Sequence, residues 1–232
     1  MTNQHRDYLH TIDVAVLRLN FEVSQVEVLV HKRLNDPFAG SLALPGLVVS
    51  GSTVDTSLPG AVKRLMDSDK VGMATRFIEQ VGTVGDAYRD PRAWSSSTYY
   101  LAFPEEHVEL SDDQMWLSMN GILSGAYKLP FDHNTLCEDI FKRLESKARY
   151  SSIPLYMIGR DFTVGEAVAA FSIVLSRPVQ KSSMRKRIVK MLEDGYLVET
   201  GEKRSGSSGP KSEVYRLVNG AEPYIFDSSL ER

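Results

Sequence analysis

The sequence contains a single cysteine, Cys137, among its 232 residues. One thiol cannot form an intrachain disulfide, and it excludes a zinc site built from several cysteines. The sequence also has no run of about 18 apolar residues, which is the length that a membrane span needs. Its first ten residues are polar and contain no apolar segment of the signal-peptide type. We therefore expect a cytoplasmic protein without a membrane partner.

A large excess of charge of one sign is also missing, since the net charge is −3 at pH 7. The charge is unevenly distributed, however, and residues 151–232 carry 12 Lys/Arg against 10 Asp/Glu. Between residues 181 and 211, eight basic residues stand against four acidic ones. Such a cluster can bind a polyanion, although a solvated helix face has the same charge pattern.

The first half of the chain has the pattern of a mixed α and β domain. Apolar and β-branched residues predict three strands, which are residues 11–19, 26–33 and 94–103. Residues 61–70 favour a helix, and residues 48–59 are rich in Ser, Thr and Gly, which is typical of an exposed loop. Apolar residues at helical spacing predict a further helix that begins near Asp132.

The second half follows the order of a winged helix-turn-helix. Residues 163–166 have the capping-box pattern that starts a helix. A second helix is predicted over residues 183–192, and Gly195 is expected to end it. A strand, a Gly/Ser-rich basic loop over residues 201–211 and a closing strand come next.

The change of pattern near residue 150 predicts a boundary between two domains. We assign residues 1–150 to the first domain and residues 151–232 to the winged helix-turn-helix domain. Residues 153–162 join the two and are the expected hinge. The predicted fold class is α+β.

The second helix and the basic loop of this module are suited to DNA contacts. A recognition helix presents polar and cationic side chains to a groove while its apolar face docks on the domain. Hydroxyl groups at the helix start can cap the helix or bond phosphates. The predicted DNA-binding residues are Lys181, Ser182, Ser183, Arg185, Lys186, Arg187, Lys190, Lys203, Arg204 and Lys211. A winged helix used for protein contacts is the alternative.

Several short segments resemble the Nudix fold in their order and spacing. They are Phe38-Ala39-Gly40, Leu44-Pro45-Gly46 and a helix that contains Ala61-Val62-Lys63-Arg64. Three more segments make the chain similar to the Nudix-related transcriptional regulator (NrtR) family, namely Arg89-Asp90-Pro91-Arg92, Phe131-Asp132-His133 and Thr200-Gly201-Glu202-Lys203-Arg204. The resemblance covers residues 11–217.

This resemblance implies a Nudix-like mixed-sheet α/β/α domain followed by a winged helix-turn-helix domain. It also implies a homodimeric repressor of NAD-related genes, in which ADP-ribose or a related nucleotide binds the Nudix-like domain and alters DNA affinity. The implied partners are a double-stranded DNA operator and a small nucleotide effector. A pseudo-palindromic operator would match a two-fold dimer.

The residues of the Nudix box depart from those of a working hydrolase. A hydrolase carries an Arg-Glu pair and a Glu-Glu pair on one helix, and these carboxylates hold divalent cations. Arg64 fits the arginine, but Leu65 stands at the first glutamate. Ser68 and Asp69 stand at the next two, and Leu47 replaces the second glycine. We therefore expect no hydrolysis, no catalytic metal and no cofactor.

A cleft with fewer acids repels a diphosphate less and can bind it without a metal. Arginine grips phosphate oxygens in a forked geometry, and aromatic rings can stack on an adenine. The predicted ligand-binding residues are Arg64, Arg89, Asp90, Arg92, Phe38, Trp94 and Gly46. Arg89 and Asp90 could instead form a local ion pair that holds a turn, and the two aromatic residues could belong to the core.

Two other functions remain open from the sequence. One is a regulator of the same architecture that senses a sugar or a sugar phosphate. The other is a metal-dependent Nudix hydrolase with a binding appendage. His31 and His133 are expected to be structural residues rather than metal ligands.

Overall fold

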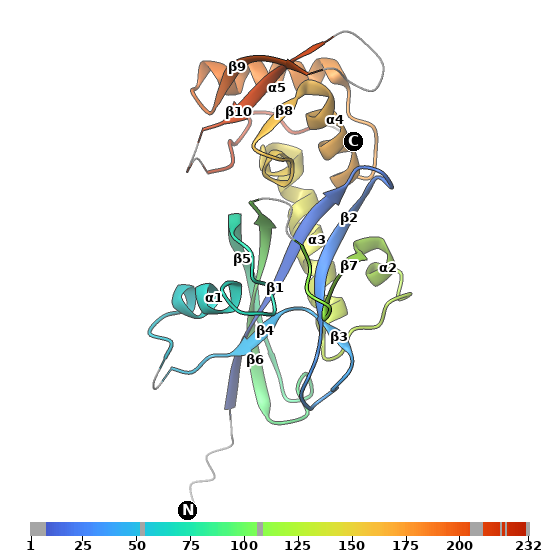
Figure 1. Ribbon diagram of the computed structural model, residues 1–232, viewed down its shortest axis with the longest axis vertical. Coiled ribbons are helices and arrows are strands. Elements are labelled where there is room, and N and C mark those ends of the chain that lie inside the picture. The colour runs from blue at the N-terminus through green and yellow to red at the C-terminus, as the bar shows by residue number, and fades with distance from the viewer. Residues whose placement is uncertain are drawn as a thin grey trace, which may run out of the picture. The chain divides into compact units, whose positions relative to one another are not determined.

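The computed structural model describes residues 8–51, 54–105, 109–204, 211–218, 220 and 222–230 (Figure 1). The chain divides into two compact units. Met1–Arg18 and Glu27–Phe141 form the first, and Leu19–Val26 and Lys142–Arg232 form the second. This division differs from the single boundary near residue 150 that we expected. Among the residues that the structure describes, no helix is both long enough and apolar enough to span a membrane.

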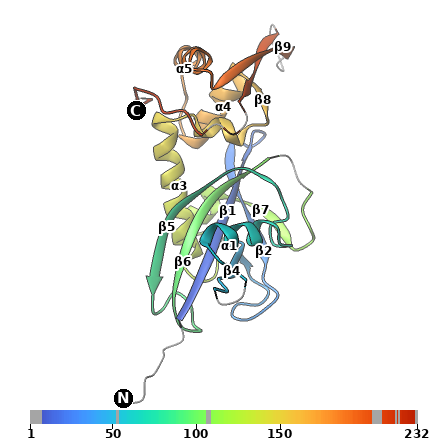
Figure 2. The same ribbon diagram turned by 90° about the vertical axis from the view of Figure 1, so that its left-hand side faces the viewer.

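The first unit is built on a mixed seven-stranded sheet (Figures 1 and 2). Its strands are β1 (Tyr8–Asn20), β2 (Gln25–Lys32), β3 (Leu42–Ala43), β4 (Gly46–Val48), β5 (Thr75–Asp86), β6 (Trp94–Pro104) and β7 (Gln114–Ser118). The central strands β1 and β6 run parallel, whereas β5 and β6 pair antiparallel. The sheet therefore has the mixed character that the resemblance to the Nudix fold implies.

Strand β5 is absent from the sequence prediction, because two glycines interrupt its alternation of side chains. At Gly82 a Cβ atom would lie 2.8 Å from the hydroxyl of Tyr99, and at Gly85 it would lie 2.9 Å from the ring of Trp94. Both aromatic side chains belong to the neighbouring strand β6. The glycines thus make room for cross-strand aromatic rings.

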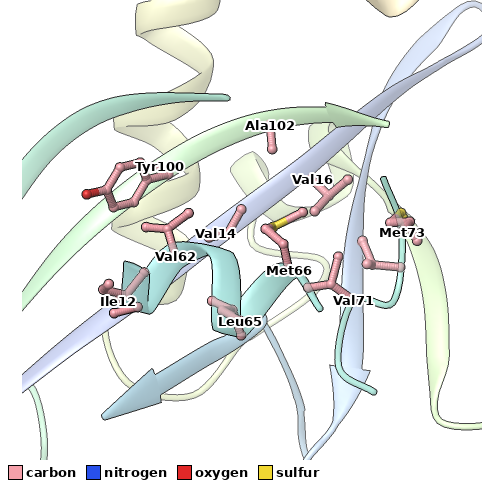
Figure 3. Packing of buried hydrophobic residues seen from close by; sticks show 12 residues of the cluster. Ile12, Val14, Val16, Val62, Leu65, Met66, Val71, Met73, Tyr100 and Ala102 are labelled. Carbon is pink, nitrogen blue, oxygen red and sulfur yellow. The ribbon is translucent and has the colours of Figure 1, made fainter. Parts of the chain in front are cut away.

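One face of this sheet carries a hydrophobic core (Figure 3). Alternate side chains of a strand point to the same face, so every second residue of β1 and β6 contributes. Helix α1 (Leu58–Met66) covers these residues with its own apolar side. The cluster includes Ile12, Val14, Val16, Val62, Leu65, Met66, Val71, Met73, Tyr100 and Ala102.

Helix α1 begins and ends earlier than the predicted 61–70. The Ser57 hydroxyl accepts a hydrogen bond from the backbone N–H of Gly60, which caps the helix start. The helix closes at Asp67, and Gly72 follows with a φ of 63°. Residues 68–70 therefore lie in a turn after the helix rather than on it.

Helix α3 (His133–Tyr150) is the predicted helix that begins near Asp132, and its bounds confirm that prediction. Its first part packs on the sheet face opposite α1 (Figure 2). The hydroxyl of Tyr99, which points away from the α1 side, donates a hydrogen bond to Asp139 at 3.2 Å. Burial in α3 raises the pKa of the Cys137 thiol to about 12. The shorter helix α2 (Met119–Leu123) follows β7.

The second unit contains helices and a small three-stranded sheet (Figure 1). Its elements are the 3-10 helix η1 (Ile153–Met157), β8 (Asp161–Thr163), α4 (Val164–Val174), α5 (Lys181–Glu193), β9 (Leu197–Arg204) and β10 (Ser212–Leu217). The strand order is β8-β10-β9. The Thr163–Glu166 capping box is present, and Gly195 has a φ of 75° after α5. Both helix-end predictions are confirmed.

The predicted hinge over residues 153–162 is wrong. This segment forms η1 and the start of β8, and its apolar side chains are packed inside the second unit. Ile153 and Phe162 are completely buried, and Leu155 is 1% exposed. The segment was expected to be a hinge because it joins the two predicted modules, but its apolar residues belong to the core of the second unit.

Candidate functional site

A polar cavity of about 200 Å³ lies in the first unit, beside β1 and β4. Four of the predicted ligand residues line it, namely Gly46, Arg89, Asp90 and Arg92. The structure thus brings together residues from β4 and from the turn between β5 and β6. Arg64, Phe38 and Trp94 are not among its lining residues.

Arg89 is a cation of this cavity whose side chain is only 5% exposed. Its Nε and one terminal nitrogen each donate to a different carboxylate oxygen of Asp132 at 2.9 Å. The same guanidinium lies 3.7 Å from Asp13. The segments 89–92 and 131–133, which are distant in sequence, therefore meet through one bidentate ion pair.

Asp90 pairs with Arg92, so the alternative of a local Arg89–Asp90 pair is wrong. The Arg92 guanidinium donates two hydrogen bonds to Asp90 at 3.0 and 2.7 Å, and the Arg92 backbone N–H donates a third at 3.0 Å. Burial alone would raise the pKa of Asp90, but these bonds outweigh it and hold that pKa below its usual value. The Asp90 carboxylate is thus charged, and it is paired with Arg92 through these three hydrogen bonds.

Gly46 is required because the backbone of β4 passes close to a buried carboxylate. A Cβ atom at Gly46 would lie 2.2 Å from an Asp13 oxygen and 3.0 Å from the carbonyl oxygen of Ile12. The Asp13 carboxylate accepts a hydrogen bond of 2.5 Å from the Ser97 hydroxyl. The cavity floor is therefore a fixed polar surface.

His133 adds a neutral imidazole to this floor. Its Nδ1 accepts a hydrogen bond from the backbone N–H of Leu44 at 3.1 Å, and its Nε2 lies 3.6 Å from Asp13. Burial lowers the pKa of His133, which favours the neutral ring. These contacts match the structural role that we expected.

Two of the predicted ligand residues, Arg64 and Trp94, contact residues outside the cavity. Arg64 donates two hydrogen bonds to Asp55 at 2.9 and 2.6 Å, and Asp55 is buried although we expected an exposed loop over residues 48–59. Trp94 stacks on Tyr8 with ring centroids 5.4 Å apart. Neither residue lines the cavity, and their role in ligand binding stays a prediction.

Phe38 does not line the cavity but packs on Phe131, which does, and its role in ligand binding stays a prediction. The two rings meet edge to face, with centroids 4.9 Å apart, and Phe131 lines the cavity. Phe131 has a φ of 58°, an uncommon backbone conformation for a bulky residue. The aromatic wall is therefore Phe131.

Two cations of the cavity were missed in the sequence analysis. Arg33 follows β2 and lies over the Phe131 ring at 4.8 Å, and Lys70 follows α1. The Lys70 ammonium donates to the Gly46 carbonyl oxygen at 2.5 Å. Lys70 directly follows the residues of the Nudix box, and this position could have indicated that it lies at the cavity. No motif near Arg33 in the sequence indicates such a position.

Lowering the pH is expected to destabilise the first unit through its buried histidines. Burial, and after it the charge of Lys70, lowers the pKa of His31 to about 4. Between pH 6.5 and 4 the unfolded chain therefore binds more protons than the folded one, and stability falls as the pH falls. His133 acts in the same direction.

The measurement is urea unfolding at pH 7.5 and at pH 4.5. His31 should account for a loss of about 2 to 3 kcal/mol at the lower pH. The variant His31→Gln should lose less stability on acidification than the wild type by that amount. An equal loss in both proteins would contradict the assignment.

Helix α5 of the second unit presents four exposed cations, three of which are Lys181, Arg185 and Lys186. No ion pair involves any of these three within the described part of the chain. Lys190 is also exposed, but it pairs with Asp194 at 3.0 Å. The first two turns of α5 therefore carry its unpaired positive charge.

Arg187 is not on this exposed face, and its predicted place among the DNA contacts is wrong. Its guanidinium donates to the carbonyl oxygens of Arg149 and Ser228 at 2.8 and 2.9 Å and lies 4.0 Å from the Phe226 ring centroid. Burial lowers the pKa of Arg187 to about 10. Arg187 lies on the same side of α5 as the buried Met184 and Met191.

The serines at the start of α5 do not cap it. Gln180 is the N-cap residue and makes no side-chain cap bond, so Ser182 and Ser183 lie inside the first turn. Ser182 is exposed there and Ser183 is half-buried. A hydroxyl at either position is available for another contact, but the predicted capping role is wrong.

The three cations that were predicted for the wing, Lys203, Arg204 and Lys211, have different surroundings. Lys203 and Arg204 are the last residues of β9, and they pair with Glu213 at 2.7 Å and Glu166 at 2.8 Å. Lys211 is exposed just before β10. The loop residues 205–210 between them lie outside the described residues.

Comparisons with known proteins identify this combination of units. A family profile described as the NrtR DNA-binding winged helix domain matches residues 154–217. The crystal structure of Shewanella oneidensis NrtR complexed with a 27mer DNA has 30% sequence identity and a TM-score of 0.82, covering 95% of this chain and 99% of that chain. The chain belongs to the NrtR family.

Two further matches cover 98% and 62% of this NrtR chain. An ADPR responsive transcriptional repressor from Acinetobacter baylyi is 29% identical over 98% of this chain and 90% of its own length. The NUDIX domain of Shewanella oneidensis NrtR complexed with ADP ribose is 30% identical, with a TM-score of 0.52, over 62% of this chain and 93% of that chain. The predicted Nudix-like domain and winged helix are thereby confirmed.

The Nudix-like fold implies a divalent-metal site, but the box residues of this NrtR chain do not fit one. Leu65 is fully buried in the hydrophobic core, where a carboxylate could not reach solvent or a ligand. The Ser68 hydroxyl donates to the Leu65 carbonyl oxygen, which leaves Asp69 as the acid at these positions. Across the described ranges, no three His, Cys, Asp or Glu side chains are grouped to hold a metal.

Proposed function

We propose that this protein is a transcriptional repressor of NAD metabolism genes that binds DNA through its winged helix and responds to ADP-ribose or a related nucleotide. The observation that carries the proposal is one chain with a cationic helix in its second unit and a cation-lined cavity in its first. The relatives support it, since one is named an ADPR responsive repressor and the others were crystallised with DNA or ADP ribose.

The DNA contacts are assigned to the exposed cations of α5 and the wing. Lys181 and Arg185 are four residues apart and so lie on one side of the helix, with Lys186 beside them. Lys211 adds a charge at the wing. Each phosphate that such a residue neutralises steepens the salt dependence, by about 0.9 in the slope of log K against log salt.

The operator is a duplex whose pseudo-palindromic halves match the two recognition helices of a homodimer. Symmetric helix-turn-helix proteins read half-sites one helical turn apart, because each copy presents one recognition helix to a major groove. Ser182 and Ser183 in the first turn of α5 can bond phosphates. Arg187 is excluded from this set because its guanidinium is buried.

An anionic effector fits the cavity best. Its wall carries four cations, Arg33, Lys70, Arg89 and Arg92, against the carboxylates of Asp13, Asp36 and Asp90. Arg89 and Arg92 are already paired with carboxylates, so an uncharged sugar would leave the charges of Arg33 and Lys70 unused. This favours a nucleotide over a plain sugar. A differential affinity of about 1 to 3 kcal/mol between the two DNA-binding states would change operator affinity about five- to 150-fold.

We assign no hydrolysis to this cavity. A metal-dependent hydrolase positions several carboxylates around its cations, and here a core leucine, Leu65, and the serine Ser68 take two of those positions. Restoring the first acid as Leu65→Glu would place a charge in the core rather than in the cavity.

The test is a gel-shift titration of a duplex from the protein's own promoter at low ionic strength. We expect retardation that weakens steeply with salt and an affinity change of about five- to 150-fold on adding ADP-ribose. Arabinose should cause no such change, and incubation of ADP-ribose with magnesium or manganese should release no AMP. Absence of retardation with and without ADP-ribose would overturn the proposal, and sustained AMP release would overturn its non-catalytic part.

A further inference from the structure

The four cations of the cavity differ in how their charge is balanced. Arg89 and Arg92 are each held by a carboxylate in a two-bond ion pair. Arg33 and Lys70 instead donate to backbone carbonyl oxygens, at 2.8 Å to Pro37 for Arg33. Within the ranges that the structure describes, neither Arg33 nor Lys70 forms an ion pair.

These two unpaired charges are close enough to repel each other. After burial, the charge of Arg33 is the next cause that lowers the pKa of Lys70. The charge of Lys70 in turn lowers the pKa of His31, and Arg33 does so more weakly. The carboxylate of Asp13 offsets part of this repulsion at Lys70, and those of Asp90, Asp13 and Asp36 offset part of it at Arg33. An anion bound against both residues would reduce the repulsion that remains.

Arg33 and Lys70 lie where two cavities meet. Both residues line the 200 Å³ cavity described above, and both line a neighbouring cavity of about 490 Å³ beside His31 and Gln114. A ligand with a charged centre and a bulky group at each end could place its centre against these two residues. A diphosphate that joins a nucleoside to a sugar has that form.

We infer that Arg33 and Lys70 bind the diphosphate of the effector directly, and that Lys70 supplies the positive charge that a divalent cation supplies in metal-dependent diphosphate sites. Guanidinium and ammonium groups both bond phosphate oxygens well, the first in a fork and the second as a point charge. The inference rests on the proposed function, because it names the residues that recognise the phosphates of the proposed nucleotide.

Calorimetric titration of ADP-ribose into the full chain tests this inference. The Kd should be the same in EDTA and in magnesium. Lys70→Met should raise the Kd about tenfold to 100-fold, since it removes a charge-assisted hydrogen bond. Lys63→Met is the control, because Lys63 is an exposed lysine on α1 with its side chain 76% exposed, and it should keep the wild-type Kd.

Loss of binding in EDTA, or a wild-type Kd in Lys70→Met, would overturn the inference. Lys70→Arg restores a cation and should recover most of the affinity, which separates charge from packing. If Lys70→Met fails to fold by circular dichroism, Arg33→Gln carries the same test with the same expected loss.

Inorganic pyrophosphate distinguishes a failure of this inference from a failure of the proposed function. It contains the charged centre alone, and it should bind the wild type more tightly than Lys70→Met or Arg33→Gln. Pyrophosphate binding without ADP-ribose binding would refute the effector and keep the phosphate site. ADP-ribose binding with equal Kd in the wild type and both variants would keep the effector and refute the phosphate site.

Discussion

Replacing Arg89 by alanine is expected to lower the free energy of unfolding by about 3 to 5 kcal/mol. The side chain is 5% exposed and holds Asp132 through two hydrogen bonds of 2.9 Å. Its removal would leave the carboxylates of Asp132 and Asp13 without their cation in a place with little water. Urea unfolding followed by circular dichroism measures the loss.

The control for Arg89→Ala is Lys63→Ala. Lys63 also forms an ion pair, with Asp67, but both side chains are more than half exposed. Exposed pairs contribute about 0 to 1 kcal/mol, so this variant should unfold close to the wild type. The double variant Arg89→Ala with Asp132→Asn should recover part of the loss, because one unpaired carboxylate is neutralised. Equal unfolding of Arg89→Ala and Lys63→Ala would contradict the buried ion pair.

Gly46→Ala is expected to cost about 1 to 3 kcal/mol of stability and to weaken ADP-ribose binding at least tenfold, as overpacking does at a tight contact. The added Cβ would overlap the Asp13 carboxylate at 2.2 Å and touch the Ile12 backbone at 3.0 Å. Strand β4 pairs with β1 at this point, so either the strand or the carboxylate must move. Thermal unfolding and calorimetry with ADP-ribose give the two numbers.

Gly51→Ala is the matched control for Gly46→Ala. Gly51 is in the same unit, and a Cβ there would meet no atom within 4 Å. This variant should keep both the unfolding free energy and the Kd for ADP-ribose. A Gly46→Ala protein that behaves like Gly51→Ala would show that the close approach to Asp13 is not needed.

Local signals in the sequence predicted part of the element order, including the helices α3, α4 and α5. The capping box at Thr163 and Glu166 and the end of α5 at Gly195 depend on neighbouring residues, and both predictions are confirmed. Strand β5 was missed because Gly82 and Gly85 accommodate rings from another strand. That requirement is visible only when β5 and β6 are placed side by side.

The candidate site was harder to predict because its partners are distant in the sequence. Arg89 lines the cavity, but its partner Asp132 is 43 positions away in the sequence. Arg187 was misplaced because three adjacent basic residues cannot all lie on one side of a helix, and the sequence did not say which one turns inward. The charge pattern of the sequence therefore indicated a cationic helix but not which of its basic residues are exposed.

The interleaving of the two units limits how the chain can be dissected. Leu19–Val26 and Lys142–Tyr150 belong to the second unit although they precede residue 151. A fragment cut at residue 151 would lose the Arg149 carbonyl oxygen that accepts a hydrogen bond from Arg187. The buried guanidinium of Arg187 would then keep only the Ser228 carbonyl oxygen as an acceptor. A single cut at residue 151 therefore does not yield a self-contained winged-helix domain.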